Sequence, residues 1–128
     1  MPKRFYLATR VDLSARASLL LEALKAQGWE RTFAWTGETD SDRYAETALK
    51  EIQGVREADV VIALLPGGRG THVEIGAALG LGKRVILHAP DRDSLTKPYP
   101  CVFHYHPGVT LLISKVIDVD AILSCMRS

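Results

Sequence analysis

A chain of 128 residues with a formal net charge of +1 has the length of one domain, and we expect residues 1–128 to form a single α/β domain. The composition is 47% hydrophobic and 24% charged, with scattered basic residues and no apolar run as long as a membrane span, so neither a membrane nor a nucleic-acid polymer is expected as a partner. Cys101 and Cys125 have no metal-type spacing, which predicts reduced thiols in a cytoplasmic protein.

Strands and helices alternate along the chain. The predicted elements, in order, are a strand at 4–9, a helix from about 12 to 27, a strand at 32–35, a helix at 43–58, a strand at 59–65, a helix at 71–81, a strand at 84–88, strand-like segments at 102–104 and 109–113, and a helix at 116–126. This order is typical of a parallel sheet of about five strands with helices on both faces.

Local signals mark the helix ends and the buried strand. Asp12 or Ser14 is expected to cap the first helix, and Gly28 to end it in a left-handed conformation. In the second helix Gly54 indicates a bend or a close packing contact, because glycine in a helix interior costs roughly 1 kcal/mol relative to alanine. The strand at 59–65 is almost continuously apolar, which predicts a parallel strand covered on both faces.

A glycine-rich turn joins that strand to the third helix. Gly67, Gly68 and Gly70 follow Pro66, and a helix is expected from Thr71. Glycine lets the backbone approach a ligand closely, and the N-terminus of a helix presents unpaired N–H groups. The segment therefore predicts a site for an anionic ligand.

Ligands of open α/β sheets bind beyond the carboxyl ends of the strands. The residues expected to converge there come from four strands and the loops that follow them: Thr9 and Arg10, Trp35 and Thr36, the Gly67–Gly70 loop with Glu74, and His88 with Ala89.

Glu74 allows three interpretations. Thr71 and Glu74 fit a capping box, with Thr71 as the N-cap and Glu74 bonding back to its N–H. In a second interpretation the loop is a phosphate-binding site and Glu74 lies beside it without a role. As a nucleophile, it would be kept ionised by the positive potential of the first helical turn. The pattern alone leaves all three open.

A second carboxylate, Glu51, lies on the predicted second helix. Two carboxylates that flank a glycosidic bond, about 5 Å apart, are the arrangement of retaining glycoside chemistry, with one nucleophile and one acid/base. The alternative for Glu51 is a solvated helix carboxylate paired with a neighbouring base.

Several segments together resemble the nucleoside 2-deoxyribosyltransferase family, which includes small N-glycosidases of deoxynucleoside monophosphates. They are Phe5-Tyr6-Leu7-Ala8, Trp35-Thr36, Ala58-Asp59-Val60-Val61-Ile62-Ala63, Gly70-Thr71-x-x-Glu74-x-Gly76-x-Ala78 and Gly82-Lys83. The resemblance implies a flavodoxin-like, doubly wound, mainly parallel five-stranded sheet.

The resemblance also implies roles for single residues. Glu74 would attack the anomeric carbon and form a glycosyl-enzyme ester, and Tyr6 would orient it by a hydrogen bond. Glu51 would be the acid/base, at a position where the family usually has aspartate. The transferases carry another aspartate where this chain has Gly68, which favours hydrolysis or an unusual acceptor. The family completes its sites with a neighbouring subunit, so a homodimer or higher homo-oligomer is expected.

A second resemblance competes for the same loop. Pro66-Gly67-Gly68-x-Gly70-Thr71-x-x-Glu74 is similar to the signature of the lysine-decarboxylase-like phosphoribohydrolases, which release cytokinin bases from riboside monophosphates. Both families cleave a nucleotide N-glycosidic bond with a glutamate at the start of a helix. A non-catalytic nucleotide-binding module is the further alternative.

The substrate expected from these resemblances is a nucleoside or nucleotide. Trp35 is placed to stack on a base, and Arg10 and Arg69 to pair with a 5′-phosphate, although each arginine also fits a solvated surface residue. Asp59 is expected to bond backbone N–H groups, and His72 to face solvent.

No metal and no cofactor are expected. His88, His104 and His106 have neither metal-ligand spacing nor a paired ligand set in the sequence.

Overall fold

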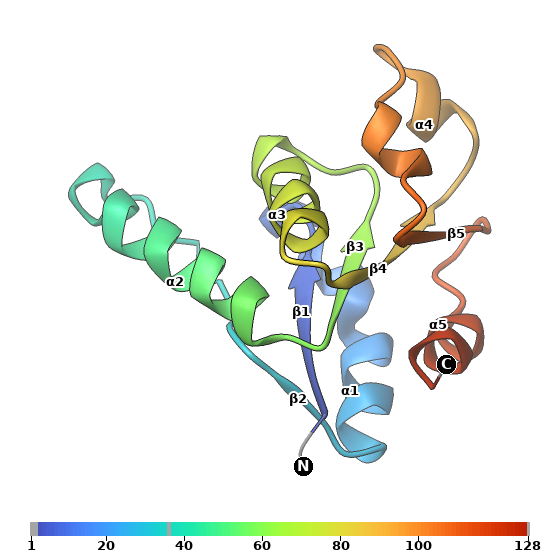
Figure 1. The fold of residues 1–128 in the computed structure, drawn as a ribbon, viewed down its shortest axis with the longest axis horizontal. Helices are drawn as coiled ribbons and strands as arrows, with labels where there is room; N and C mark the ends of the chain where they lie inside the picture. Colours follow the sequence, from blue (N-terminus) through green and yellow to red (C-terminus); the bar gives the residue numbers. More distant parts are fainter. Residues whose placement is uncertain (1–2, 36, 128) are drawn as a thin grey trace.

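The computed structural model describes residues 3–35 and 37–127 and contains one sheet of five parallel strands (Figure 1). The sheet has the order β2-β1-β3-β4-β5 and consists of β1 (Lys3–Ala8), β2 (Trp29–Arg31), β3 (Val60–Leu64), β4 (Arg84–Ala89) and β5 (Val109–Ile113). The predicted doubly wound, flavodoxin-like α/β fold is confirmed, and every pair of neighbouring strands is parallel.

Helices cover both faces of this sheet (Figure 1). The helical elements are η1 (Val11–Ala17), α1 (Ser18–Ala26), η2 (Ser41–Arg43), α2 (Tyr44–Glu57), α3 (Arg69–Gly80), α4 (Asp93–Thr96), η3 (Val102–Tyr105) and α5 (Val119–Met126). Side chains of α1 and α5 form one apolar core with the sheet, and those of α2, α3 and α4 form the other. Within the described residues no helix is long and apolar enough to span a membrane.

Side chains along β1 point alternately to the two faces of the sheet, and this alternation determines on which face the candidate site lies. Phe5 and Leu7 belong to the core under α1 and α5, whereas Tyr6 and Ala8 belong to the core under α2 and α3. Every residue of β3 is buried, as its continuous apolar run predicted. Tyr6 is therefore a buried polar side chain beneath the two helices that carry Glu51 and Glu74.

The second strand begins earlier than predicted. β2 spans Trp29–Arg31 and not 32–35, because Gly28 turns the chain with φ 86° and Trp29 pairs at once with Lys3 of β1. Trp29 is buried in the core, whereas the chain leaves the sheet after Thr32, whose N–H donates to the carbonyl of Phe5. Residues 32–35, which are more hydrophobic than Trp29–Arg31, follow the last residue of β2 that pairs with β1.

Two further local predictions are wrong. The segment 102–104 is part of the 3₁₀ helix η3, in which the N–H of His104 donates to the carbonyl of Cys101 at 3.1 Å. Neither Asp12 nor Ser14 caps the first helix, since Asp12 pairs with Arg10 and the Ser14 hydroxyl donates to the carbonyl of Val11. That region begins as the 3₁₀ turn η1, and Gly28 follows it in the predicted left-handed conformation.

Candidate active site

Tyr6 of β1 joins the two carboxylates. Its hydroxyl donates a hydrogen bond to Glu74 Oε2 on α3 and lies 3.4 Å from Glu51 Oε1 on α2. The three side chains come from segments separated by 45 and 68 positions, and only the packing of α2 and α3 over β1 brings them together. The structure thus assembles Tyr6, Glu51 and Glu74 into one cluster.

Gly54 permits the close approach of α2 to β1. A Cβ atom at this position would lie 3.0 Å from the Tyr6 ring and 2.9 Å from the Cβ of Phe33, both too close for unstrained packing. Gly54 lies one helical turn after Glu51, so its contact with the Tyr6 ring sets the height of Glu51 above the sheet. The predicted close packing at Gly54 is confirmed.

Helix α3 carries Glu74 in its second turn. The helix begins at Arg69, two residues earlier than predicted, and its N-cap is Gly68. Thr71 stabilises this end because its hydroxyl accepts a hydrogen bond from the N–H of Gly68 at 3.3 Å. Glu74 is buried and makes its bond to Tyr6 instead, so the interpretation of Thr71 and Glu74 as a capping box is wrong.

The electrostatics of Glu74 also differ from the prediction. The pKa of Glu74 is raised to about 8, mainly by burial and also by the neighbouring Glu51, while the hydrogen bond from Tyr6 acts in the opposite direction. A first-turn carboxylate held ionised by the helix was expected. Burial near a second carboxyl outweighs any effect of the helix because Glu74 lies beyond the first turn. The pKa of Tyr6 is raised, mainly by burial and then by Glu74, so Tyr6 remains a hydrogen-bond donor.

A cavity of about 190 Å³ opens onto the carboxylates. Its lining comes from the segments that follow β1 and β2, from α2, and from Gly68 with the first two turns of α3, and consists of Thr9, Arg10, Val11, Trp35, Glu51, Gly68, Gly70, Thr71 and Glu74. Most residues that the sequence assigned to the pocket are therefore brought together, while Thr36 lies outside the described residues.

Four predicted pocket residues lie elsewhere, and one of them, Ala89, is fully buried in the apolar core under α2, α3 and α4. Gly67 and Arg69 line a separate cavity of about 760 Å³ on the other side of the glycine loop, and Arg69 is exposed. His88 is buried near the end of β4 with its Nε2 at 2.9 Å from the hydroxyl of Ser114, and it lines a third cavity. The expected convergence of four strand ends therefore holds without β4, because the side chain of His88 lies on the other face of the sheet, where it lines the third cavity together with Arg16 and Leu20.

Arg16 is a supporting residue that sequence reasoning missed. Its guanidinium donates to the carbonyls of Leu64 at 3.0 Å and Leu65 at 2.8 Å, and to the hydroxyl of Thr9 at 3.1 Å. These bonds tie the first helical segment to the point where β3 turns into the glycine loop. No local signal identifies Arg16, because its partners lie 48 and 49 positions away.

Asp59 has the structural role that was expected. Its carboxylate accepts a hydrogen bond from the backbone N–H of Arg4 at 2.9 Å, which links the start of β3 to β1. The donor is a residue of strand β1.

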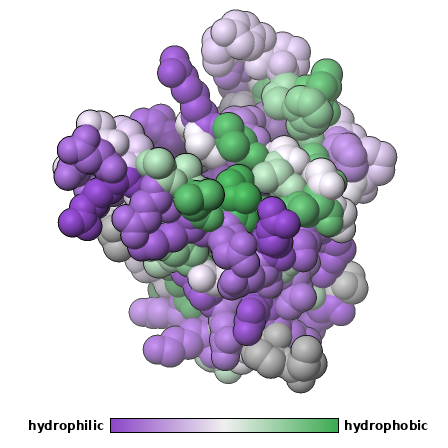
Figure 2. All heavy atoms as spheres, turned by 60° about the vertical axis from the view of Figure 1, so that its left-hand side comes forward, coloured by the Kyte–Doolittle hydropathy of each residue, from purple (hydrophilic) through white to green (hydrophobic). Residues whose placement is uncertain are grey.

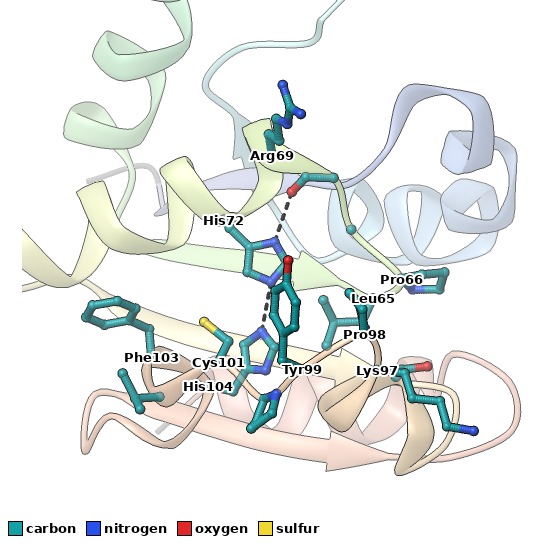
Figure 3. Close-up of a pocket in the computed structure, with 15 residues that line it drawn as sticks. Leu65, Pro66, Arg69, His72, Lys97, Pro98, Tyr99, Cys101, Phe103 and His104 are labelled. Carbon is teal, nitrogen blue, oxygen red and sulfur yellow. Dashed lines mark hydrogen bonds between the residues drawn. The ribbon is translucent and has the colours of Figure 1, made fainter.

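A second polar cluster lies in the larger cavity, on the other side of the glycine loop (Figure 3). His72 is half-buried and does not simply face solvent as expected: its Nδ1 lies 2.9 Å from the carbonyl oxygen of Gly68, and its Nε2 lies 2.9 Å from Nε2 of His104. Cys101 lies next to both rings, and the ligand atoms of the three residues are within 4.8 Å of one another. No spacing pattern in the sequence groups these three residues.

The family model described as Nucleoside 2-deoxyribosyltransferase matches residues 5–120. Among solved structures, the chain is similar to the CMP N-glycosidase BcmB of Clostridium botulinum, with 25% identity, a TM-score of 0.69 and 98% of each chain covered.

Two further structures share the fold. A 2-deoxyribosyltransferase of Bacillus psychrosaccharolyticus is 16% identical with a TM-score of 0.62, over 93% of this chain and 89% of the other. A conserved protein of Enterococcus faecalis V583 is 16% identical with a TM-score of 0.64, over 99% and 98%. No curated protein matches the chain. With most of its length matched by the family model, the chain belongs to the nucleoside 2-deoxyribosyltransferase family.

Proposed function

We propose that the protein cleaves the N-glycosidic bond of a nucleoside or a nucleoside 5′-monophosphate through a glycosyl-enzyme intermediate on Glu74. The observation that carries this proposal is the pair of carboxylates, Glu51 and Glu74, that meet at the hydroxyl of Tyr6 beside a cavity. Family membership and the similarity to a CMP N-glycosidase support an enzyme of the deoxyribosyltransferase or N-glycosidase type.

The first step requires an ionised nucleophile. The Glu74 carboxylate attacks C1′ of the sugar, the bond between C1′ and the base nitrogen breaks, and its electron pair leaves with the base. Glu51 gives its proton to the departing base. The hydroxyl of Tyr6 donates to Glu74 and holds the attacking carboxylate in place.

The second step releases the sugar. Glu51, now a carboxylate, removes a proton from water, and the hydroxide attacks C1′ and displaces Glu74. When a second base takes the place of water, the same step transfers the sugar. Gly68 at the position of the transferases' aspartate favours water as the acceptor, as the sequence comparison implied.

The pair must hold one proton in its active form. Glu74 has to be ionised for attack while Glu51 has to be protonated for base release. Because the pKa of Glu74 is raised to about 8, the free site holds its proton up to weakly alkaline pH. Turnover therefore uses the arrangement in which the one proton of the pair lies on Glu51 and Glu74 is ionised.

The cavity lining supplies groups for the rest of the substrate. Trp35 presents an aromatic face for the base, and it is 37% exposed at the cavity. Cβ atoms would meet nothing within 4 Å at Gly70 and only the Arg10 side chain at Gly68, so the loop leaves room for a ligand. The N-terminus of α3 and Arg10 are the groups suited to a 5′-phosphate, whereas Arg69 lies outside this cavity.

The test is a chromatographic assay for free base. The protein is incubated with ribo- and deoxyribonucleosides and their 5′-monophosphates, CMP among them, with and without an added acceptor base. Release without an acceptor indicates a hydrolase, and exchange only with an acceptor indicates a transferase. Preference for adenine riboside monophosphates would indicate the phosphoribohydrolase alternative.

The Glu74→Gln variant is the matched control for this assay, because it keeps the shape of the side chain and removes the nucleophile. We expect its turnover to fall by about 10³-fold or more while nucleotide binding remains. Full activity in Glu74→Gln would contradict the mechanism. Nucleotide binding with no base release from any substrate would favour the non-catalytic binding module.

A further inference from the structure

We propose that His72, Cys101 and His104 form a binding site for a thiophilic divalent metal ion, of which Zn²⁺ is the best fit. The rings of His72 and His104 face each other in the larger cavity with Cys101 beside them (Figure 3), and the ligand atoms of the three residues lie within 4.8 Å of one another. None of the three lines the cavity of Glu74, so this site is separate from the proposed nucleotide chemistry.

The local backbone explains why Cys101 and His104 face the same way. Cys101 is the N-cap of η3, and the N–H of His104 donates to its carbonyl in a 3₁₀ turn. Side chains three positions apart eclipse one another in a 3₁₀ turn, so the thiol and the imidazole project from the same side. Helix α3 then supplies His72 from the opposite wall of the cavity.

The hydrogen bond of His72 fixes the nitrogen that would bind metal. Because the carbonyl of Gly68 only accepts, Nδ1 of His72 carries the proton and Nε2 of the neutral ring presents a lone pair toward His104. A backbone carbonyl that orients the second nitrogen in this way is a common partner of metal-ligating histidine. His104 is buried, and Nε2 of His72 is the one polar partner of its ring among the described residues.

Binding of a tetrahedral ion requires the ligand atoms, which now lie within 4.8 Å of one another, to adjust their spacing. With Zn–N near 2.0–2.1 Å and Zn–S near 2.3 Å, ligand atoms of a tetrahedral site lie roughly 3.3 to 3.7 Å apart. The two Nε2 atoms are 2.9 Å apart and therefore need to separate by a few tenths of an ångström. Two imidazoles and one thiolate form a set that suits zinc, and a fourth position faces the cavity.

The test uses metal binding and not activity. We expect Zn²⁺ to raise the Tm of the wild-type protein by on the order of 5 °C at saturation, and EDTA to reverse the rise. Co²⁺ is expected to bind once per chain and to give the intense visible bands of tetrahedral cobalt together with a thiolate-to-cobalt charge-transfer band. Mg²⁺ at the same concentration should change neither signal, because it prefers oxygen ligands.

Substitutions inside and outside the cluster of His72, Cys101 and His104 test whether these residues bind the metal ion. Cys101→Ser and His72→Gln should abolish the charge-transfer band and reduce Co²⁺ affinity at least tenfold. The controls Cys125→Ser and His106→Gln alter a thiol and an imidazole outside the cluster and should bind Co²⁺ like the wild type. The proposal is wrong if wild-type protein shows no tetrahedral cobalt spectrum, or if Cys101→Ser retains the charge-transfer band.

Discussion

Glu74 is buried beside another carboxyl group, and this placement has a cost for folding. Burial and the neighbouring Glu51 together raise the pKa of Glu74 in the folded protein to about 8, whereas glutamate in the unfolded chain ionises near about 4.3. The folded state therefore holds the proton more tightly. The contribution of Glu74 to stability is fully present below about pH 4.3 and is lost as the pH rises toward 8.

Replacement of Glu74 by Gln should remove this pH dependence. The neutral amide resembles the protonated carboxyl, so we expect Glu74→Gln to unfold at a higher temperature than the wild type at pH 8, with a much smaller difference at pH 5. The difference in unfolding free energy should grow by at most about 1.4 kcal/mol per pH unit. Thermal unfolding of both proteins from pH 5 to 8 measures it, with Glu30→Gln on the exposed surface of β2 as control.

The pair of Glu51 and Glu74 also predicts how turnover depends on pH. The value of kcat/KM should fall as the pH rises through an apparent pKa near 8, because the pair then loses the one proton that its active form needs. Glu51→Gln removes the acid, so its kcat/KM should be much lower and should not fall across this pH range. Tyr6→Phe removes a hydrogen bond that lowers this pKa and should move the midpoint of the fall to higher pH. A fall that persists unchanged in Glu51→Gln, together with an unmoved midpoint in Tyr6→Phe, would contradict the assignment of this pH dependence to the pair.

At the scale of elements, the packing of α2 on β1 positions the acid/base. Gly54→Ala would gain helix propensity but place a Cβ 2.9 Å from Phe33 and 3.0 Å from the Tyr6 ring. We expect a net loss of about 1–3 kcal/mol in stability, and a larger fractional loss in kcat than in KM, because Glu51 moves with the helix.

Gly76→Ala is the matched control for this prediction. Gly76 lies in the interior of α3, is exposed, and would meet nothing within 4 Å of a new Cβ. We therefore expect Gly76→Ala to stabilise the protein by up to about 1 kcal/mol. Thermal unfolding and steady-state kinetics of the two variants separate a general effect of alanine from the specific contact at Gly54. Equal behaviour of the two would argue against a positioning role for that contact.

The elements also show which features a sequence can reveal. Residues 60–64 were predictable because a strand buried on both faces is apolar at every position. The bounds of the edge strand β2 were not predictable. Trp29 and Arg31 pair with β1 through backbone atoms, and backbone pairing leaves no pattern in the sequence. The start of α3 was misplaced because Gly68 and Gly70 suggest a loop, although Gly68 serves as its N-cap.

Some residues of the candidate site were likewise predictable from the sequence, and others were not. Glu74 and Glu51 were found because their spacing in known relatives is regular. Arg16 and the grouping of His72 with Cys101 and His104 were not found, because these contacts depend on tertiary packing across 29 or more positions. Long-range polar contacts leave no periodic pattern in a sequence.

At the scale of the whole molecule, the site is small for its expected ligand. The cavity over Glu74 measures about 190 Å³, below the roughly 300–1,000 Å³ typical of small-molecule sites. Hydrophobic side chains also gather across one face of the molecule between hydrophilic regions (Figure 2). Leu49 of α2 is 74% exposed and Val73 of α3, next to Glu74, is 61% exposed. Both observations favour the expected homo-oligomer, in which a second copy adds a wall to the pocket.

The oligomer prediction is tested with one surface variant on each side of the sheet. Light scattering should give a native mass of at least twice the 14.1 kDa of the chain. Val73→Lys should lower that mass and raise KM for the nucleotide at least tenfold, because a buried lysine opposes association. Leu19→Lys introduces the same charge at a side chain of α1 that is 73% exposed on the other side of the sheet, and it should change neither quantity. A monomeric wild-type protein whose KM is unaffected by Val73→Lys would show that one chain forms the whole site.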